Sequence, residues 1–201
     1  MIELKVLQAV RLKGRIAPAD IAATVGEDPT AVADAVRAAT EAGSLIEGKT
    51  VRLSPEGRTR LNGLLAAERE NVDQVAISDA YDKFRSVNAD FKVLVANWQL
   101  KDGEPNPHDD QEYDSAVLAR LVDVHRRVTP VTAAVATQIP RLTGYSDKLD
   151  AALAKVQAGD TTWLTCPIID SYHTVWFELH EELILAAGLT RESEAQAGHA
   201  Y

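Results

Sequence analysis

The sequence predicts a mainly α-helical protein in two parts, in which three helices and a β-hairpin precede an all-α helical bundle. Apolar residues recur at helical spacing through most of the 201 residues. The clearest hairpin signal is a pair of short apolar-rich runs that flank Glu47-Gly48-Lys49. Charge is unevenly divided, because residues 1–65 carry nine Lys and Arg against eight Asp and Glu, whereas residues 66–201 carry twelve against twenty-two. We therefore expect a domain over 1–65, a bundle over 66–190 and a flexible tail over 191–201.

The composition of the whole chain excludes several classes of protein. A net charge of −9 argues against a protein that coats nucleic acid without sequence preference, since such binding needs a basic surface. No apolar run approaches the roughly 20 residues that span a bilayer, and the first residues lack the basic-then-apolar order of a secretory signal. We therefore expect a cytoplasmic protein with no membrane partner. Cys166 is the single cysteine, which excludes an internal disulfide and disfavours a cysteine-based zinc site.

Residues 1–65 show start and stop signals for successive helices. A first apolar stripe ends before Gly14, and a second helix opens at Pro18, where the missing N–H of proline is harmless. A third helix opens at Asp28, a good N-cap, and closes at Gly43. After the hairpin, Ser54 is followed by a proline and an acid, which is the ordinary opening of another helix. The predicted order is helix, helix, helix, hairpin, helix.

Two stretches of this region carry a resemblance to known regulators. They are residues 16–26, and residues 42–46 running into 51–57. Together they resemble the winged helix-turn-helix domains of the MarR and PadR classes of bacterial transcription regulator, over about a third of the chain. The resemblance implies a protein that binds double-stranded DNA with its third helix in the major groove. It also implies a helical bundle that joins two copies into a homodimer, binds an effector, or does both.

Candidate DNA contacts lie on the third helix, on the hairpin and on the helix after it. Arginine has the fork geometry that reads guanine, and basic side chains bind phosphates. Asp34 and Glu41 on the third helix would repel the DNA backbone, and an alternative is that all of these charges are simply solvated. The candidate DNA-binding residues are Thr30, Arg37, Lys49, Arg52, Arg58 and Arg60.

Beyond residue 65, helical signals dominate. The segment 101–110 is rich in turn formers and acids and predicts a loop. Thr129-Pro130 predicts a break between two helices, and residues 162–167 predict a short extended piece. The predicted helices are enough for a single bundle core, and they cover about 56–74, 78–100, 113–128, 130–139, 145–158 and 171–187.

The last predicted helix gathers aromatic residues and two histidines. His173 and His180 are seven residues apart, which places them on one face but roughly 10 Å apart along the axis. One interpretation is an aromatic core with satisfied histidines at its edge. A second is a pocket for a small aromatic or acyl-type anionic effector, held by an aromatic wall, imidazoles and one guanidinium. The candidate ligand-binding residues are Tyr81, Arg85, Phe91, Trp98, His173, Trp176 and His180.

A third interpretation is a metal site that joins one of these histidines to His125 and to Asp123 or Glu178. Regulators of the GntR class bind metal in a helical C-terminal domain through an aspartate and three histidines, but the histidine spacing here departs from that pattern. The HExxH, GxSxG, P-loop and dinucleotide motifs are absent, and Cys166 has no base near it in the sequence. We therefore expect a protein that is not an enzyme, with no catalytic residue, no metal and no cofactor.

The last predicted helix carries a second resemblance. Residues 170–183 are similar to helical segments of actinobacterial proteins related to phosphoenolpyruvate-utilising phosphotransfer enzymes, which implies a subunit or partner of such an enzyme. The favoured hypothesis is a DNA-binding regulator in which a ligand changes the spacing of two recognition helices. The alternative is an adaptor that uses a winged helix to dock a partner protein without binding DNA.

Overall fold

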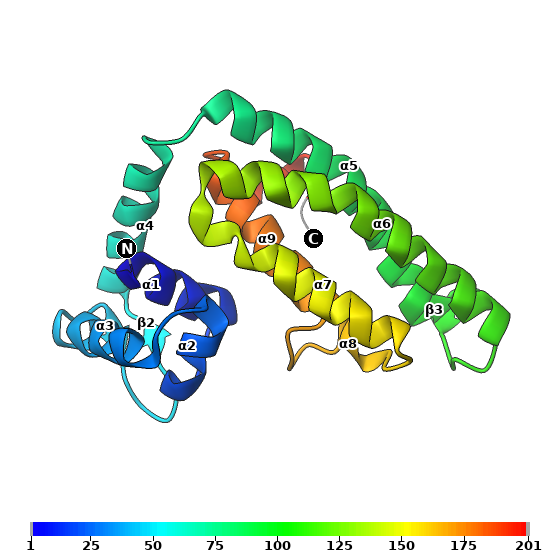
Figure 1. Cartoon of the computed structure of the whole chain (residues 1–201), viewed down its shortest axis with the longest axis horizontal. Helices are drawn as coiled ribbons and strands as arrows, with labels where there is room; N and C mark the ends of the chain where they lie inside the picture. Colours follow the sequence, from blue (N-terminus) through cyan, green and yellow to red (C-terminus); the bar gives the residue numbers. More distant parts are fainter. Residues whose placement is uncertain (1, 200–201) are drawn as a thin grey trace. The chain divides into compact units, whose positions relative to one another are not determined.

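The structure is a computed structural model that describes residues 2–199. The chain divides into two compact units between Val72 and Asp73. The described residues are mainly helical and include two small antiparallel sheets (Figure 1). Met1, in the predicted first domain, and the last two residues of the predicted tail lie outside the described range. No helix between residues 2 and 199 is long and apolar enough to cross a membrane.

The first unit follows the predicted order of helices and strands. Local side chains explain where the helices begin: the Asp28 carboxylate accepts a hydrogen bond from the Ala31 N–H, and the Ser54 hydroxyl accepts one from the Gly57 N–H. The elements are α1 (Ile2–Lys13), α2 (Pro18–Val25), α3 (Pro29–Glu41), β1 (Leu45–Ile46), β2 (Arg52–Leu53) and α4 (Pro55–Arg69).

The β1–β2 hairpin gains a third segment from the link between α1 and α2. Leu45 pairs with Leu53 in the antiparallel hairpin, and Ile16 forms an antiparallel bridge with Val51. Because side chains alternate along a strand, the paired apolar residues face inward. The buried core of this unit is completed by Leu4, Leu7, Val10, Ile21, Val32, Val36 and Leu61.

The second unit is a helical bundle with one small hairpin. Helices α5 and α6 form a long pair that lies side by side, and α9 packs against both α5 and α7 (Figure 1). The elements are α5 (Gln74–Gln99), β3 (Leu100–Lys101), β4 (Glu104–Pro105), α6 (Gln111–Gln138), a 3₁₀ turn η1 (Pro140–Leu142), α7 (Gly144–Gln157), α8 (Thr162–Thr165), α9 (Tyr172–Ala186) and α10 (Arg191–Gln196).

Helix α6 contradicts the predicted break at Thr129-Pro130. It runs through Pro130 without interruption, although a proline inside a helix loses a hydrogen bond at a cost of about 3 kcal/mol. Pro130 is exposed, whereas the apolar stripe on the opposite side continues past it and is buried on both sides of the proline. Burial of this stripe offsets the lost bond. Its members are Val117, Leu121, Val124, Val128, Val131 and Val135.

Two further local predictions differ from the structure, the first in its helix and the second only in part. The piece predicted as extended, residues 162–167, contains the short helix α8, which buries Leu164 completely. The predicted loop at 101–110 contains the β3–β4 hairpin, whose turn residues Asp102 and Gly103 both have positive φ. An Asp-Gly pair is a typical hairpin turn because it tolerates that backbone conformation.

The segment after residue 190 differs from the predicted flexible tail. Residues 191–196 form α10, which opens with a capping box between Thr190 and Ser193. Glu194 on this helix is buried, with a relative exposure of 2%. The segment is therefore anchored to the bundle rather than free along its described length.

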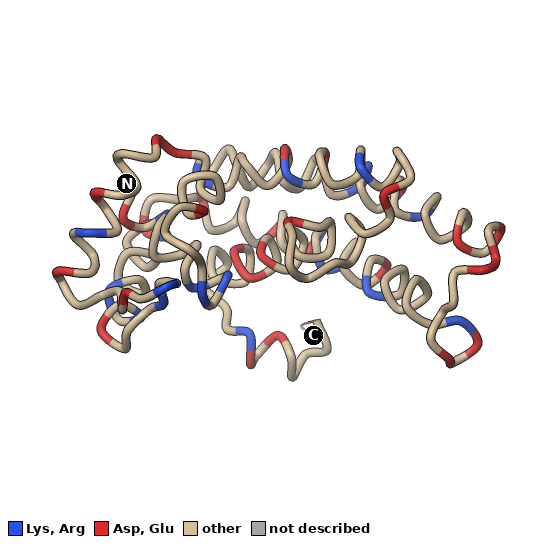
Figure 2. Tube along the Cα trace, turned by 90° about the horizontal axis from the view of Figure 1, so that it is seen from below, with Lys and Arg blue, Asp and Glu red and all other residues tan. Residues whose placement is uncertain are grey.

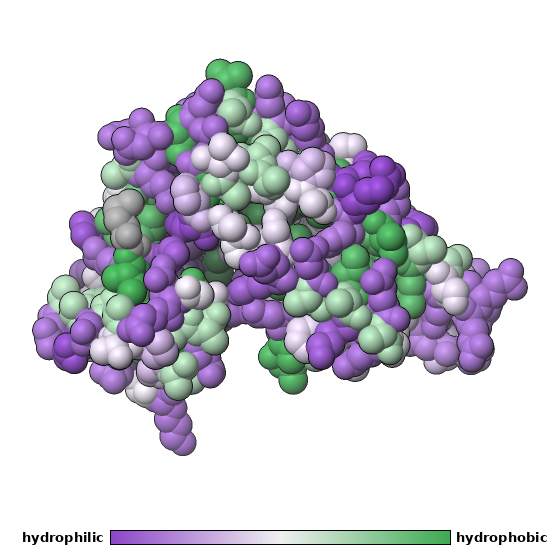
Figure 3. Space-filling model, in the orientation of Figure 1, coloured by the Kyte–Doolittle hydropathy of each residue, from purple (hydrophilic) through white to green (hydrophobic). Residues whose placement is uncertain are grey.

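The surface of the bundle is mixed in character. Figure 2 shows acidic and basic positions interspersed along its helices. Figure 3 shows hydrophilic residues over most of the face that it presents, with hydrophobic residues in small groups between them. The exposed large hydrophobic residues of this unit lie on several elements; they are Val75, Val93, Leu100, Val122 and Ile168.

Candidate functional site

Three basic candidates on the first unit are exposed and unpaired. Lys49, Arg52 and Arg58 lie on the hairpin and at the start of α4, and none has an ion-pair partner within residues 2–199. The bridge between Ile16 and Val51 brings the segment that contains Arg15 alongside the segment that contains Arg52. Arg15 is also exposed and has no ion-pair partner among residues 2–199. We call these four residues, Arg15, Lys49, Arg52 and Arg58, the basic edge.

The other DNA-binding candidates have different surroundings. Arg37 on α3 donates to Asp34 at 2.7 Å, and both side chains are more than half exposed, so this pair is weak. Arg60 is held more firmly, since it donates to both carboxylate oxygens of Glu3 at 2.8 and 2.7 Å, and these hydrogen bonds lower the pKa of Glu3. Thr30 is exposed in the first turn of α3. Arg37 and Thr30 are thus accessible, whereas Arg60 is engaged.

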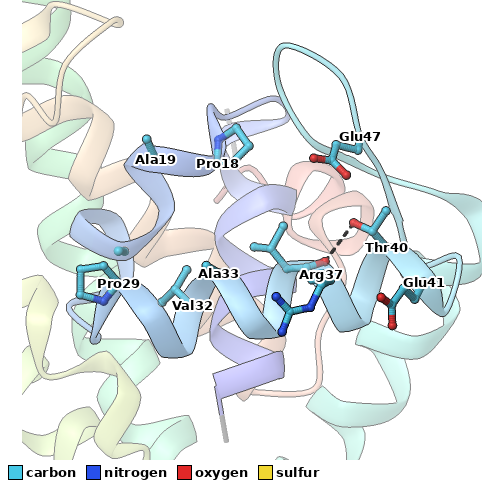
Figure 4. Close-up of a pocket in the computed structure, with 11 residues that line it drawn as sticks. Pro18, Ala19, Pro29, Val32, Ala33, Arg37, Thr40, Glu41 and Glu47 are labelled. Atoms are coloured by element: carbon cyan, nitrogen blue, oxygen red, sulfur yellow. Dashed lines mark hydrogen bonds between the residues drawn. The ribbon is translucent and has the colours of Figure 1, made fainter.

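A groove of about 600 Å³ lies between α2, α3 and the hairpin (Figure 4). Its wall is mostly apolar, and Arg37 and Thr40 on α3 supply polar lining. Two acids, Glu41 on α3 and Glu47 on the hairpin, stand at one end. The apolar lining residues are Pro18, Ala19, Ala22, Pro29, Val32, Ala33 and Val36.

In the second unit, the predicted aromatic wall is a packed core. The rings of Phe84 and Phe91 on α5 lie 5.0 and 4.4 Å from that of Trp176 on α9, and all three side chains are fully buried. The Trp176 indole N–H donates to the Asn88 side-chain oxygen at 2.9 Å. Ring contacts at these distances are those of close-packed aromatic pairs. A ligand could reach Phe91 or Trp176 only by displacing protein atoms.

The structure separates the seven ligand-binding candidates into distinct places. Tyr81, Arg85 and His180 come together at one end of the α5–α9 contact. His173 lies beside Phe91, with ring centres 6.1 Å apart. Trp98 is elsewhere, near the β3–β4 hairpin, where its ring centre lies 4.3 Å from that of His108 in a tilted arrangement.

The cluster of Tyr81, Arg85 and His180 surrounds a carboxylate of the same chain. The Tyr81 hydroxyl donates to Glu194 Oε2 at 2.6 Å, and Arg85 donates to both Glu194 oxygens at 3.1 and 2.5 Å. His180 Nε2 lies 3.1 Å from the same Tyr81 hydroxyl. Because that hydroxyl has one proton and gives it to Glu194, His180 must donate from Nε2. The result is a chain of hydrogen bonds from His180 through Tyr81 to Glu194.

The electrostatics of this cluster favour a neutral histidine and a charged carboxylate. Burial lowers the pKa of His180 to about 4. Burial also acts to raise the pKa of Glu194, but the hydrogen bonds from Arg85 and Tyr81 outweigh it and lower that pKa. Burial and Glu194 raise the pKa of Tyr81, and the hydrogen bond to Glu194 raises the pKa of Arg85. At neutral pH the cluster therefore holds one anion and one cation.

Stability of the second unit is expected to fall as the pH drops from about 7 to about 5. In the unfolded chain His180 takes up a proton below its ordinary pKa of about 6.5, whereas the folded state resists protonation down to about 4. The loss over that interval is about 2 kcal/mol, and burial lowers the pKa of His173 in the same direction. Urea unfolding followed by tryptophan fluorescence measures it. The His180→Gln variant should lose less stability than the unaltered protein over the same pH interval. If the two proteins lose the same stability, the pH dependence does not come from His180.

The residues of the metal interpretation are not brought together. His125 has Nε2 2.8 Å from Asp150 and Nδ1 3.2 Å from the Tyr172 hydroxyl, while Asp123 pairs with Arg126. Within residues 2–199, no three histidine, cysteine or acidic side chains form a group that could hold a metal ion.

Sequence reasoning missed three residues of these sites. Glu194 falls in the segment that the sequence predicts to be a flexible tail, although Thr190 followed by Ser193 is a helix-start signal that indicates α10. Arg15 joins the basic edge only through strand pairing, and Asn88 meets Trp176 across 88 residues of chain. Neither of these long-range contacts has a local sequence signal.

Comparison with known proteins identifies no relative of the chain. It matches no protein-family model, no curated protein and no solved structure. The inference of function therefore depends on the residues described above.

Proposed function

We propose that the protein is a transcription regulator whose first unit binds double-stranded DNA. The observation that carries the proposal is the basic edge, four exposed and unpaired cations on adjacent segments of one small module. Cations placed in this way bind phosphates without regard to sequence and orient a module on the duplex. Bases would be read by α3, where Arg37 can leave its weak pair with Asp34.

The arrangement of elements supports the interpretation of this unit as a winged helix-turn-helix domain. Helices α2 and α3 are joined by a short turn at Gly26, whose φ of 65° ends α2. The β1–β2 hairpin follows α3, as a wing would, and carries two members of the basic edge, Lys49 and Arg52. In this proposal α3 enters the major groove and the hairpin contacts the adjacent backbone.

Charge reversal on the basic edge tests the proposal. Lys49→Glu with Arg52→Glu should weaken DNA binding at least about tenfold and reduce the slope of log affinity against log salt by about 2, because two phosphate contacts are lost. The matched control, Lys83→Glu with Arg120→Glu, makes the same charge change at exposed positions of the second unit. Fluorescence anisotropy with duplex DNA from upstream of the gene, at low and physiological salt, measures both.

The same titration can overturn the proposal. Equal losses of DNA affinity in the two double variants would show that only net charge matters. If the unaltered protein binds no DNA even at low salt, the proposed DNA-binding function is wrong. Preference for the upstream duplex over a scrambled one of equal length is expected for a regulator. Light scattering should report a homodimer, since two modules double the contacts.

A second candidate function, protein docking, is favoured by the groove between α2 and α3. The groove has an apolar wall with Glu41 and Glu47 at one end, so it fits an amphipathic segment of a partner that carries a basic side chain. In this alternative the protein is an adaptor that binds such a segment of a phosphotransfer enzyme. Glu41→Lys with Glu47→Lys separates the two functions. It should strengthen DNA binding if the first proposal holds and abolish capture of a partner if the second holds.

A further inference from the structure

We propose that Tyr81, Arg85 and His180 form a binding site for a small-molecule carboxylate, which the C-terminal segment 190–199 keeps closed with its own Glu194. The site lies wholly within the second unit. The proposal goes beyond DNA binding and does not depend on it. It names the carboxylate as the chemical class of an effector, with Glu194 standing in its place in the structure.

The three residues form a complete receptor for a carboxylate. Arg85 presents a two-pronged donor to both oxygens, and Tyr81 adds a third hydrogen bond of 2.6 Å to one of them. His180 fixes the direction of the Tyr81 hydroxyl by donating to its oxygen. The Arg85 guanidinium lies 4.5 Å from the centre of the Tyr81 ring, so the two donors that hold the carboxylate also contact each other. The site is therefore specific for the carboxylate group itself.

Glu194, the group that occupies the receptor, lies on a very short helix. Helix α10 has six residues, which is too short to be stable in isolation, and Glu194 is its only buried residue. Further contacts of the described segment include Arg191, which pairs with Glu181 and lies over the Phe177 ring, and the His199 carbonyl, which accepts a hydrogen bond from Asn88. Exchange of one carboxylate for another at the receptor would therefore release a segment of about ten residues.

The receptor would keep its shape without Glu194. Arg85 also donates to Asp82, three residues earlier on α5, at 2.8 Å, which orients the guanidinium independently of α10. With the segment in place, Tyr81 and His180 are 1% and 3% exposed, so deleting the Glu194 carboxylate alone leaves the Tyr81 hydroxyl without its acceptor in a buried site. Unsatisfied buried donors are costly, and an anion in the empty site relieves that cost.

Chemical rescue tests the site. Glu194→Ala in the full chain deletes a CH₂ and a carboxylate, the atoms that acetate supplies. Sodium acetate should give a saturable rise of a few degrees in the Tm of this variant, whereas sodium chloride at equal ionic strength should not. Arg85→Met added to Glu194→Ala should abolish the response. An equal response of the single and double variants, or none in the single variant, overturns the proposal.

Displacement in the unaltered protein tests the same site without relying on that variant. Sodium benzoate should speed proteolysis within residues 187–199 relative to sodium chloride at equal ionic strength, because it competes with Glu194. Benzoate should have no such effect on Arg85→Met, in which the segment is already loosened. An unchanged cleavage rate in the unaltered protein overturns the proposal. Neither assay contains DNA, so each outcome is independent of the DNA-binding test.

Discussion

Replacing Gly57 by alanine is expected to lower the free energy of unfolding of the first unit by about 3 kcal/mol or more. Gly57 is buried in the first turn of α4, where the helix crosses the end of α3 and the start of the hairpin. A Cβ at this position would lie 2.0 Å from the Ser44 carbonyl oxygen and 2.8 Å from its carbon. These are backbone atoms, so no side chain can move aside to make room.

The same crossing is held by hydrogen bonds that such a displacement would break. The Ser54 N–H donates to the Ser44 carbonyl at 3.1 Å, and the Ser54 hydroxyl donates to the Gly43 carbonyl at 2.6 Å. Shifting α4 away from Ser44 separates these groups and exposes Leu61 and Leu65, which are buried on the same helix. The hairpin that carries Lys49 and Arg52 would lose its support, so the DNA binding that we propose should fall together with stability.

Gly63 provides the matched control on the same helix. It is exposed, and a Cβ there would meet no atom within 4 Å. Gly63→Ala is therefore expected to stabilise the unit by about 0.5–1 kcal/mol, since alanine is the better helix former. Far-UV circular dichroism during urea unfolding measures both variants. All three tryptophans, Trp98, Trp163 and Trp176, lie in the second unit, so their fluorescence reports that unit alone. Equal effects of the two alanines would contradict the close approach at Gly57.

Replacing Arg141 by methionine is expected to destabilise the second unit by about 3–5 kcal/mol, because it leaves a buried charge unpaired. Arg141 in η1 lies 2.7 Å from Glu182 on α9, and their side chains are only 9% and 3% exposed. Glu182 Oε2 receives no well-aligned hydrogen bond, so the attraction between the two groups is mainly coulombic. Removing the guanidinium leaves the carboxylate without its counter-charge in a dry environment.

A second substitution shows whether the charge is the cause. Arg141→Met with Glu182→Leu removes both charges of this pair, and the part of the lost stability that is due to the unpaired Glu182 carboxylate should return, since an apolar pair can replace a buried ion pair. Arg126→Met breaks the exposed pair with Asp123 and should have a small effect. Tryptophan fluorescence during urea unfolding measures all three. If Arg141→Met destabilises no more than Arg126→Met, the pair is not buried as described.

Local patterns were sufficient to predict most helices of this protein. Asp28 with Pro29, and Ser54 with Pro55, mark helix starts because their chemistry is satisfied by neighbours a few residues away. The same reasoning failed at Pro130, where burial of Val128 and Val131 on the opposite face outweighs a local helix-breaking signal. A prediction from the sequence counts the lost hydrogen bond but cannot see the packing that offsets it.

The candidate sites show the same contrast between local signals and long-range contacts. Arg37, Lys49, Arg52 and Arg58 could be named from the sequence because charge and position in an element are local properties. Pairing of Arg60 with Glu3 spans 57 residues, and it changes a candidate phosphate contact into an engaged ion pair. The sequence could not show which of these cations is free, since that depends on which acid lies opposite each one.

By itself, the sequence determined a mainly helical chain with a short hairpin near its start and a concentration of aromatic residues and histidines in two later helices. Only the tertiary structure decided that Tyr81, Arg85 and His180 meet, that Trp98 lies apart from them, and that Glu194 fills the space between them. The physical reason is the range of the interactions. Helix periodicity and capping act over about four residues, whereas Glu194 reaches Tyr81 across 113 residues through the packing of α5, α9 and α10.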